Sequence, residues 1–226
     1  MVKVLAVGDI HTKRWIISLV ESVVEEYDKV VFVGDYADDW NADSYESIDT
    51  WQRLKTLSDK NSDKIVVLQG NHDHIYVNDT SSLQSGYDHM TKYLIDMPSN
   101  KTTKEWLAGL PYVVKIDGVT YSHAGIDDRW DEKDMWTDTS PIWVRPNAAR
   151  YKKMRQVVGH TPQRTVTRVE PNIWLIDTFS THPNGSPIGD GTMLEIIDGK
   201  KFNKIKIHAD NNNTSSFKSK LPRQGA

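Results

Sequence analysis

Six side chains that can bind metal ions follow the ends of apolar segments along this 226-residue chain. Asp9 and His11 come first, directly after the apolar run Val4–Val7. Side chains two positions apart in an extended chain point the same way, so this carboxylate and this imidazole share one face. Such a pair suits a borderline divalent ion. The full set contains three imidazoles, two carboxylates and one amide: Asp9, His11, Asp35, Asn71, His123 and His160.

The six residues can hold two divalent ions if one carboxylate bridges the pair. Asp35 is the natural bridge because it is central in the set. Two ions ~3.5–4 Å apart can bind a phosphoryl oxygen jointly and lower the pKa of a shared water, so that hydroxide exists near neutral pH. The chain has no cysteine, which excludes a thiolate metal site and a disulfide framework. The sequence therefore predicts a dinuclear centre in which water is the nucleophile.

Three further side chains could complete phosphate chemistry around these ions. His72 follows Asn71 directly, and a positioned imidazolium can protonate a departing alkoxide, which typically contributes ~10²–10⁴-fold. A carboxylate behind this ring, for which Asp38 is the candidate, would fix its tautomer and keep it protonated. Arg145 could bind the remaining phosphate oxygens in a bidentate manner.

Three apolar segments must position the first four ligands. Residues 2–8, 29–33 and 64–68 are predicted strands, and the apolar spacing in 13–27 and 44–57 predicts helices between them. This alternation is typical of parallel strands joined by right-handed crossovers. Ligands in open α/β sheets bind beyond the carboxyl ends of the strands, where the polar residues of this chain fall.

The second half of the chain is predicted to be richer in strands. Asp117-Gly118 indicates a tight hairpin turn between strands at 112–116 and 119–122, after a mostly helical stretch at 79–111. Further strands are predicted at 157–158, 164–169, 173–176, 192–197 and 202–207. A short helix is expected at 148–154, and the acidic stretch at 127–138 is expected to be a surface loop or lid. We expect one domain over residues 1–209, and a flexible tail over 210–226, which has too little apolar content to pack.

Charge and hydropathy exclude several classes of protein. The 28 basic and 31 acidic residues nearly balance, so bulk binding to nucleic acid or to an anionic membrane is not expected. No apolar run approaches the ~20 residues of a membrane helix, and the first residues do not resemble a signal peptide. These features predict a cytoplasmic protein without a membrane partner.

Five ordered motifs resemble those of the calcineurin-like metallophosphoesterases. The likeness is strongest to the PPP branch, which includes protein Ser/Thr phosphatases, bacterial and phage phosphatases, and symmetrical diadenosine tetraphosphate hydrolases. It spans about residues 2–197, and Ile176-Asp177-Thr178 resembles a late Asp-Thr-Gly element of that branch. The five motifs are Gly8-Asp9-Ile10-His11, Gly34-Asp35-Tyr36-Ala37-Asp38, Gly70-Asn71-His72-Asp73, Ser122-His123-Ala124-Gly125 and Gly159-His160-Thr161-Pro162.

The resemblance implies an α/β fold, namely a four-layer αββα sandwich of two mixed sheets flanked by helices. It also implies the division of the ligands: Asp9, His11 and Asp35 on one ion, and Asp35, Asn71, His123 and His160 on the other. His72 is implied as proton donor with Asp38 behind it. The donor types suit Mn²⁺, with Fe²⁺ or Zn²⁺ as alternatives, and fit Ca²⁺ poorly.

Two departures from the family pattern leave the substrate open. Asp39 stands where the family has a phosphate-binding arginine, and Trp40 stands where it has glycine. A carboxylate there would weaken binding of a phosphomonoester unless a cation such as Lys13 or Arg14 compensates. The expected substrate is a phosphoprotein or another phosphomonoester. The alternatives are a nucleotide diester or dinucleoside polyphosphate, and a catalytically weak module that binds a phosphorylated ligand.

Overall fold

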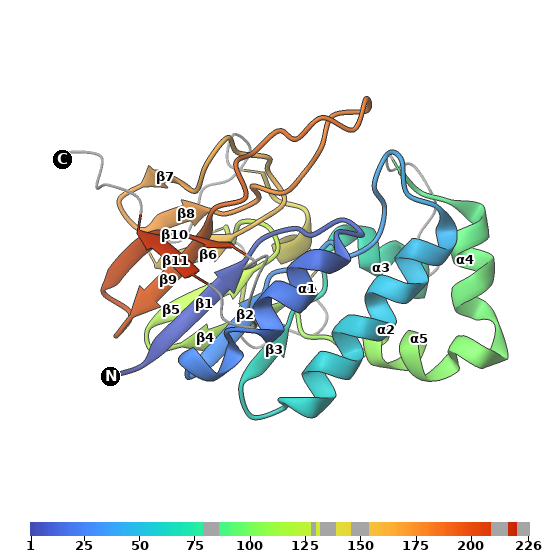
Figure 1. Cartoon of the computed structure of the whole chain (residues 1–226), viewed down its shortest axis with the longest axis horizontal. Helices are drawn as coiled ribbons and strands as arrows, with labels where there is room; N and C mark the ends of the chain where they lie inside the picture. Colours follow the sequence, from blue (N-terminus) through green and yellow to red (C-terminus); the bar gives the residue numbers. More distant parts are fainter. Residues whose placement is uncertain (79–85, 128–129, 132–138, 146–153, 209–216, 221–226) are drawn as a thin grey trace.

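The computed structural model describes residues 1–78, 86–127, 130–131, 139–145, 154–208 and 217–220. Within these ranges the chain forms two mixed β-sheets with helices beside them (Figure 1). None of the helices in these ranges is long and apolar enough to cross a membrane.

The first sheet has six strands in the order β11-β10-β9-β1-β2-β3. β1 (Lys3–Val7), β2 (Lys29–Phe32) and β3 (Ile65–Val67) are parallel, as the predicted crossovers require. β9 (Met193–Ile197) pairs antiparallel with β1, and β10 (Lys201–His208) pairs antiparallel with β9 through the turn at Asp198-Gly199. β11 (Phe217–Lys220) closes this edge beside β10. It falls inside the stretch for which we expected a flexible tail.

The second sheet has five strands in the order β4-β5-β6-β8-β7. β4 (Val113–Ile116) and β5 (Val119–Ser122) form the predicted hairpin, and Asp117 and Gly118 both have positive φ, as a tight two-residue turn needs. β6 (Arg155–Val158) and β8 (Ile173–Leu175) continue the sheet in parallel, and β7 (Thr167–Glu170) ends it in antiparallel pairing.

Alternate residues of the parallel strands serve two separate cores. Leu5 and Val7 of β1 pack in a core that lies between the first sheet and the helices. Val4 and Ala6 pack in a second core, which lies between the two sheets and includes Tyr121 of β5. Because both faces of these strands are buried, their sequences are continuously apolar rather than alternating.

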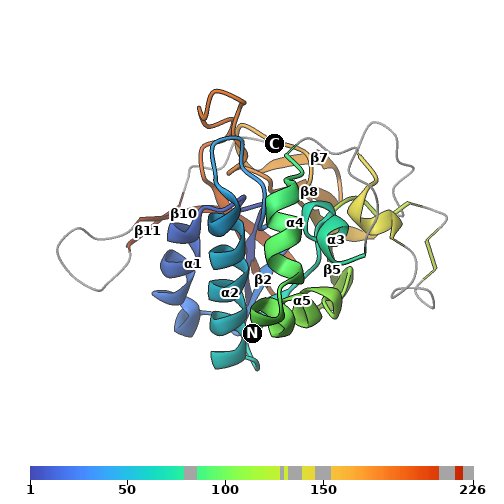
Figure 2. The same cartoon turned by 90° about the vertical axis from the view of Figure 1, so that its right-hand side faces the viewer.

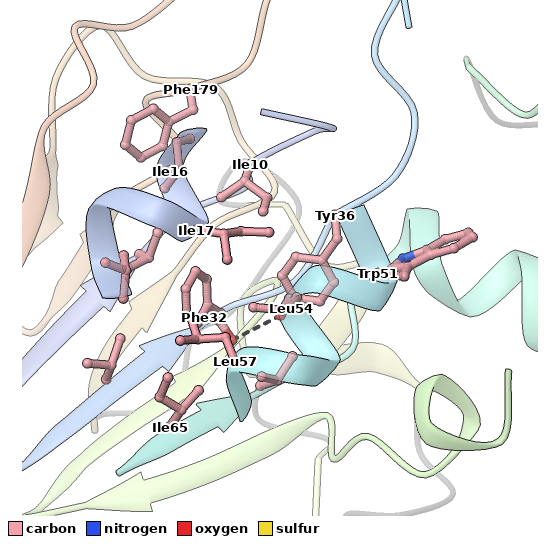
Figure 3. Close-up of a cluster of buried hydrophobic side chains, with 14 of the residues drawn as sticks. Ile10, Ile16, Ile17, Phe32, Tyr36, Trp51, Leu54, Leu57, Ile65 and Phe179 are labelled. Carbon is pink, nitrogen blue, oxygen red and sulfur yellow. Dashed lines mark hydrogen bonds between the residues drawn. The ribbon is translucent and has the colours of Figure 1, made fainter. Parts of the chain in front are cut away.

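The helices cover the outer face of the first sheet (Figure 2). They are α1 (Arg14–Glu21), α2 (Ser44–Lys60), α3 (Asn71–Val77), α4 (His89–Asp96) and α5 (Lys101–Ala108). Figure 3 shows the core beneath them, where Phe32, Tyr36 and Leu54 lie among the apolar side chains. The Tyr36 hydroxyl donates to the Leu68 carbonyl oxygen at 2.6 Å and lies 3.2 Å from that of Phe32, which ties the loop after β2 to the ends of β2 and β3.

Three local predictions differ from the structure or fall outside it. The helix expected over 13–27 divides into α1 and a 3-10 turn at Val24–Glu26, because the Ser22 hydroxyl bonds the Leu19 carbonyl oxygen at the end of α1. Helix α3 was not predicted, since seven residues are too few to show helical periodicity. A helix expected at about 148–154 lies, except for Met154, outside the described residues.

Candidate metal centre

The carboxyl ends of five strands meet at one edge of the two sheets and bring the six predicted ligands together. β1 leads to Asp9 and His11, β2 to Asp35, and β3 to Asn71 at the start of α3. β5 and β6 lead to the two histidines contributed by the second sheet, His123 and His160. All six are buried except His11, which is partly exposed.

Ligand atoms of the set form two groups that share one carboxylate. Asp9, His11 and Asp35 form the first group, and in it all ligand atoms lie within 4.8 Å of one another. Asp35, His123 and His160 meet the same criterion in the second group. Asp35 is therefore the only member of both groups among the described residues, which matches its predicted position as the bridge.

The ring of His123 is held so that Nε2 faces three other ligand atoms. Its Nδ1 lies 3.1 Å from the carbonyl oxygen of Val33, which can only accept, so the proton of the neutral ring is on Nδ1. The Nε2 lone pair then faces Asn71 Oδ1 at 2.7 Å, His160 Nδ1 at 3.1 Å and Asp35 Oδ2 at 3.3 Å. Two imidazole nitrogens, an amide oxygen and a carboxylate oxygen gathered in this way are donor types that suit one divalent transition-metal ion.

The first group shows the same preference for a cation. His11 donates from Nδ1 to the carbonyl oxygens of Ala37 and Asp38, at 3.0 and 2.7 Å, so its Nε2 is free to bind. Asp9 accepts from the His160 backbone N–H through Oδ2 at 2.8 Å, but buried Oδ1 has no hydrogen-bond partner within the described part of the chain. A Cβ at Gly159 would lie 1.9 Å from that oxygen. The donor set fits two divalent ions.

Burial keeps His11 and His160 in the neutral form that binds metal, but it disfavours the charged form of Asp9. Burial lowers the pKa of His160 to about 3 and lowers the pKa of His11, so both rings are neutral at pH 7. Burial, together with the charges of Asp177 and Asp35, raises the pKa of Asp9 well above its usual value. Carboxylates gathered in this way need compensating positive charge, which divalent ions supply.

The loops that carry the ligands hold a backbone conformation that is uncommon outside glycine. His11, Asp35 and His160 have φ of 39°, 56° and 63°. Strain of this kind persists only where surrounding contacts determine it, and it gathers at functional sites.

Asp73 holds the strained loop at Asp35 in place, a function that was not predicted from the sequence. Its carboxylate accepts from the backbone N–H groups of Asp35, Tyr36 and Gly70 at 2.9–3.1 Å. The indole N–H of Trp51 in α2 supplies a fourth donor at 2.8 Å. Four donors fill the acceptor positions of this carboxylate.

His72 lies beside the metal ligands and bonds Asp38, as the sequence predicted. His72 Nδ1 is 2.9 Å from Asp38 Oδ2, and the Tyr76 hydroxyl donates to Asp38 Oδ1 at 2.6 Å. Burial by itself lowers the pKa of an imidazole, but here the negative charges of Asp35 and Asp38 outweigh it and raise the pKa of His72 to about 9. This balance of charges favours the protonated ring near neutral pH.

Asp38→Asn is expected to shift the basic side of the pH–rate profile. The raised pKa of His72 means that the ring is protonated below that pKa and loses its proton as the pH rises through it. Removing the adjacent carboxylate lowers this pKa by roughly 1–3 units, so kcat/KM should fall at a lower pH than in the wild type. The profile is measured with an alkyl phosphate in Mn²⁺, and an unmoved basic limb contradicts the pairing.

Four of the six ligands, together with His72 and Arg145, line one cavity. A cavity of about 270 Å³ is lined by Asp9, His11, Asp35, His72 and His160 together with Arg145. Among the described lining residues Arg145 is the only lysine or arginine, and its side chain is exposed. It can therefore reach an anion that enters the cavity.

Asp39 also lines the cavity, but its charge is neutralised. Lys13 Nζ lies 2.5 Å from Asp39 Oδ2, and both side chains are largely buried. Burial opposes ionisation of Asp39, yet the Lys13 ammonium holds the pKa of this carboxyl below its usual value. Lys13 is therefore the cation that compensates the charge of Asp39, one of the two candidates named from the sequence. Arg14 instead pairs with Glu46 and Asp49 of α2.

Asp177 is a fourth buried carboxylate of the cleft, and sequence reasoning assigned it no function. It accepts from the Ser180 backbone N–H at 3.3 Å and from the Ser180 hydroxyl at 2.9 Å. Burial raises its pKa. The available signal was its place in Ile176-Asp177-Thr178, after β8. The acidic loop expected at 127–138 lies mostly outside the described residues, and Asp127 itself is buried rather than solvated.

Comparison with known proteins supports the fold and shows the family. The model of the calcineurin-like phosphoesterase family matches residues 2–205. A protein serine/threonine phosphatase from Saccharomyces cerevisiae with similarity to human phosphatase PP5 superposes with a TM-score of 0.66 at 14% identity, covering 100% of this chain and 81% of its own. A search of curated protein sequences gave no match.

Two further solved structures are more distant. A metallophosphoesterase from Sphaerobacter thermophilus has a TM-score of 0.49 at 16% identity, covering 86% of this chain and 83% of its own. Yfce, a phosphoesterase from E. coli, has a TM-score of 0.42 at 16% identity, covering 86% and 88%. The family match extends over most of the chain and includes every strand that carries a predicted ligand. The chain therefore belongs to the calcineurin-like phosphoesterase family and is a metal-dependent hydrolase of phosphate esters.

Proposed function

We propose that this protein is a dinuclear phosphomonoesterase of the PPP type, acting on a phosphoprotein or a small phosphomonoester. The observation that carries the proposal is the convergence of His123 Nε2 with Asn71 Oδ1, Asp35 Oδ2 and His160 Nδ1. Asp9, His11 and Asp35 would hold one ion, and Asp35, Asn71, His123 and His160 the other. When bound, two such ions polarise a phosphoryl oxygen and make water nucleophilic near neutral pH.

The residues of the chain then divide the remaining tasks. Asp35 orders both groups of ligands, and its Oδ1 also accepts from the His72 backbone N–H at 2.9 Å, which places that side chain at the cleft. His72 delivers a proton to the departing oxygen, and Asp38 with Tyr76 fixes its ring. Arg145 binds phosphate oxygens from the open side of the cavity. The ions are Mn²⁺ by preference, from the mixture of imidazole, carboxylate and amide ligands.

A nucleotide phosphodiester or a dinucleoside polyphosphate is the second candidate substrate, and one observation favours the diester. The ion pair of Lys13 and Asp39 contributes no net charge where the family has arginine. A diester carries one negative charge on its phosphate and a monoester about two near neutral pH, so a site with few cations penalises a monoester more. Arg145, which lines the same cavity, and two bound ions would favour the monoester.

A substrate panel separates these candidates. In Mn²⁺ we expect kcat/KM for p-nitrophenyl phosphate and a phosphopeptide to exceed that for bis-p-nitrophenyl phosphate by at least about tenfold, or roughly 1.4 kcal/mol. Diadenosine tetraphosphate should be a poor substrate. The same preparation is analysed for metal content. A faster diester or dinucleotide reverses the order of the candidates, and tight binding without turnover in saturating Mn²⁺ favours the binding module.

A further inference from the structure

Two loops outside the ligand set form one wall of the cavity, and they are joined by specific contacts. The Trp40 indole N–H donates to the Thr181 carbonyl oxygen at 3.1 Å. The Thr181 hydroxyl donates to Asp39 Oδ1 at 2.8 Å. The loop after β8, orange at the top of Figures 1 and 2, carries Thr181, His182 and Pro183, and all three line the cavity beside Trp40.

Trp40 is held in place and yet left open to solvent. Its indole is oriented by the bond to Thr181, but the residue is 50% exposed. The equally exposed Trp15 packs edge-on against Phe179 and does not line the cavity. A fixed and uncovered indole offers a flat apolar face, on which planar rings prefer to stack.

Trp40 lines the same cavity as His72 and Asp38, the pair that would protonate a leaving group. It is two residues beyond Asp38, the carboxylate that bonds His72. The group that protonates the departing oxygen must lie on the side of the leaving group. Arg145 and the ligand clusters would hold the phosphate. Near Trp40, Lys13 is paired with Asp39, so among the described residues this rim has no unpaired cation that would bind a phosphate.

We propose that Trp40, supported by Thr181, is a stacking surface for a planar leaving group, and so selects phosphate esters of nucleosides or of aromatic alcohols over aliphatic ones. This inference rests on the proposed phosphomonoesterase function. The indole face supplies selectivity without hydrogen-bond readout, because every nucleobase or aryl ring has a π-face. The two sources of such a ring share this chemistry, and the test distinguishes them.

Two matched pairs of substrates test the effect of a planar ring in the leaving group. AMP and ribose 5-phosphate are both esters of the primary 5-hydroxyl of ribose, and only AMP carries a base. Benzyl phosphate and cyclohexylmethyl phosphate are both esters of primary alcohols, with a planar and a puckered ring of similar size. For the wild type in Mn²⁺ we expect kcat/KM to favour the planar member of at least one pair, and the pair that responds names the source.

Trp40→Ala should remove this preference. Stacking on an aromatic side chain predicts a loss of about 5- to 150-fold in kcat/KM for the planar ester, with the aliphatic partner unchanged within about twofold. Trp40→Phe keeps a ring and should retain most of the preference. Trp15→Ala, which removes an equally exposed indole outside the cavity, should have no effect on either pair. Thermal unfolding checks that each variant is folded.

The outcomes separate the stacking surface from the proposed function. If the wild type hydrolyses both members of each pair alike, or Trp40→Ala slows them equally, the stacking surface is refuted and the phosphomonoesterase stands. If no ester is turned over, the proposed function fails. Calorimetry with AMP and ribose 5-phosphate in Mn²⁺ then decides whether Trp40 forms a stacking surface. Tighter AMP binding in the wild type but not in Trp40→Ala then supports the surface, and equal binding overturns it.

Discussion

His72→Ala should lower kcat for an alkyl phosphate by about 10²–10⁴-fold, while hydrolysis of p-nitrophenyl phosphate falls much less. The imidazole, which its two carboxylate neighbours keep protonated, donates to the departing oxygen. An alkoxide needs that proton in order to leave, whereas nitrophenolate is a weak base and leaves without one. The ratio of the two losses is therefore a signature of proton donation, and steady-state kinetics in saturating Mn²⁺ measure it.

The control for His72→Ala is the metal content of the same preparation. The side chain of His72 is outside both groups of ligand atoms, so the bound Mn²⁺ should be unchanged. His74→Ala provides a second control on the same helix, since His74 bonds Gln69 and does not line the cleft. Equal losses with both esters, at full metal occupancy, would show that His72 does not supply the proton.

Asp35→Asn should remove both ions, because Asp35 is the carboxylate that the two ligand groups share. We expect the affinity for each ion to fall by at least about 100-fold and turnover to fall with it. An amide is nearly the same size as a carboxylate, so the change removes charge with little change in volume. Titration with Mn²⁺, followed by calorimetry and metal analysis, gives the stoichiometry independently of activity.

Asp9→Asn is the matched comparison for the bridging position. Asp9 belongs to the first ligand group alone, so this variant should retain one ion of the pair at near wild-type affinity. A loss of one ion in Asp9→Asn and of both in Asp35→Asn distinguishes a bridge from a general effect of removing acidic charge. Two ions bound normally by Asp35→Asn would remove the bridging assignment.

The candidate metal ligands and the strands before them could be predicted because each corresponds to a short, local sequence pattern. A continuously apolar segment predicts a strand buried on both faces, and Gly-Asp or Gly-Asn at its end places polar atoms at the edge of a sheet. The Asp117-Gly118 turn was equally local. These signals predicted the strands around Asp9, Asp35 and Asn71 to within one or two residues.

What could not be predicted depends on contacts between distant segments. Asp73 is one carboxylate among 31 acidic residues until the fold brings four N–H groups to it. Thr181 meets Asp39 across 142 positions of sequence, and no periodicity records such a pairing. The missed helix α3 has a different cause, because its seven residues begin inside the ligand motif and offer too few apolar positions for a pattern.

The separation of the two apolar cores has a consequence for how this enzyme tolerates change. Leu5 and Ala6 are adjacent in sequence, yet one packs against the helices and the other against the second sheet. Both anchor β1, whose end carries Asp9, and a 1 Å displacement of a reacting group can cost about 100-fold in rate. The position of Asp9 thus depends on side-chain volume in both cores. A change of side-chain volume in either core should therefore be detectable as altered turnover before the protein unfolds.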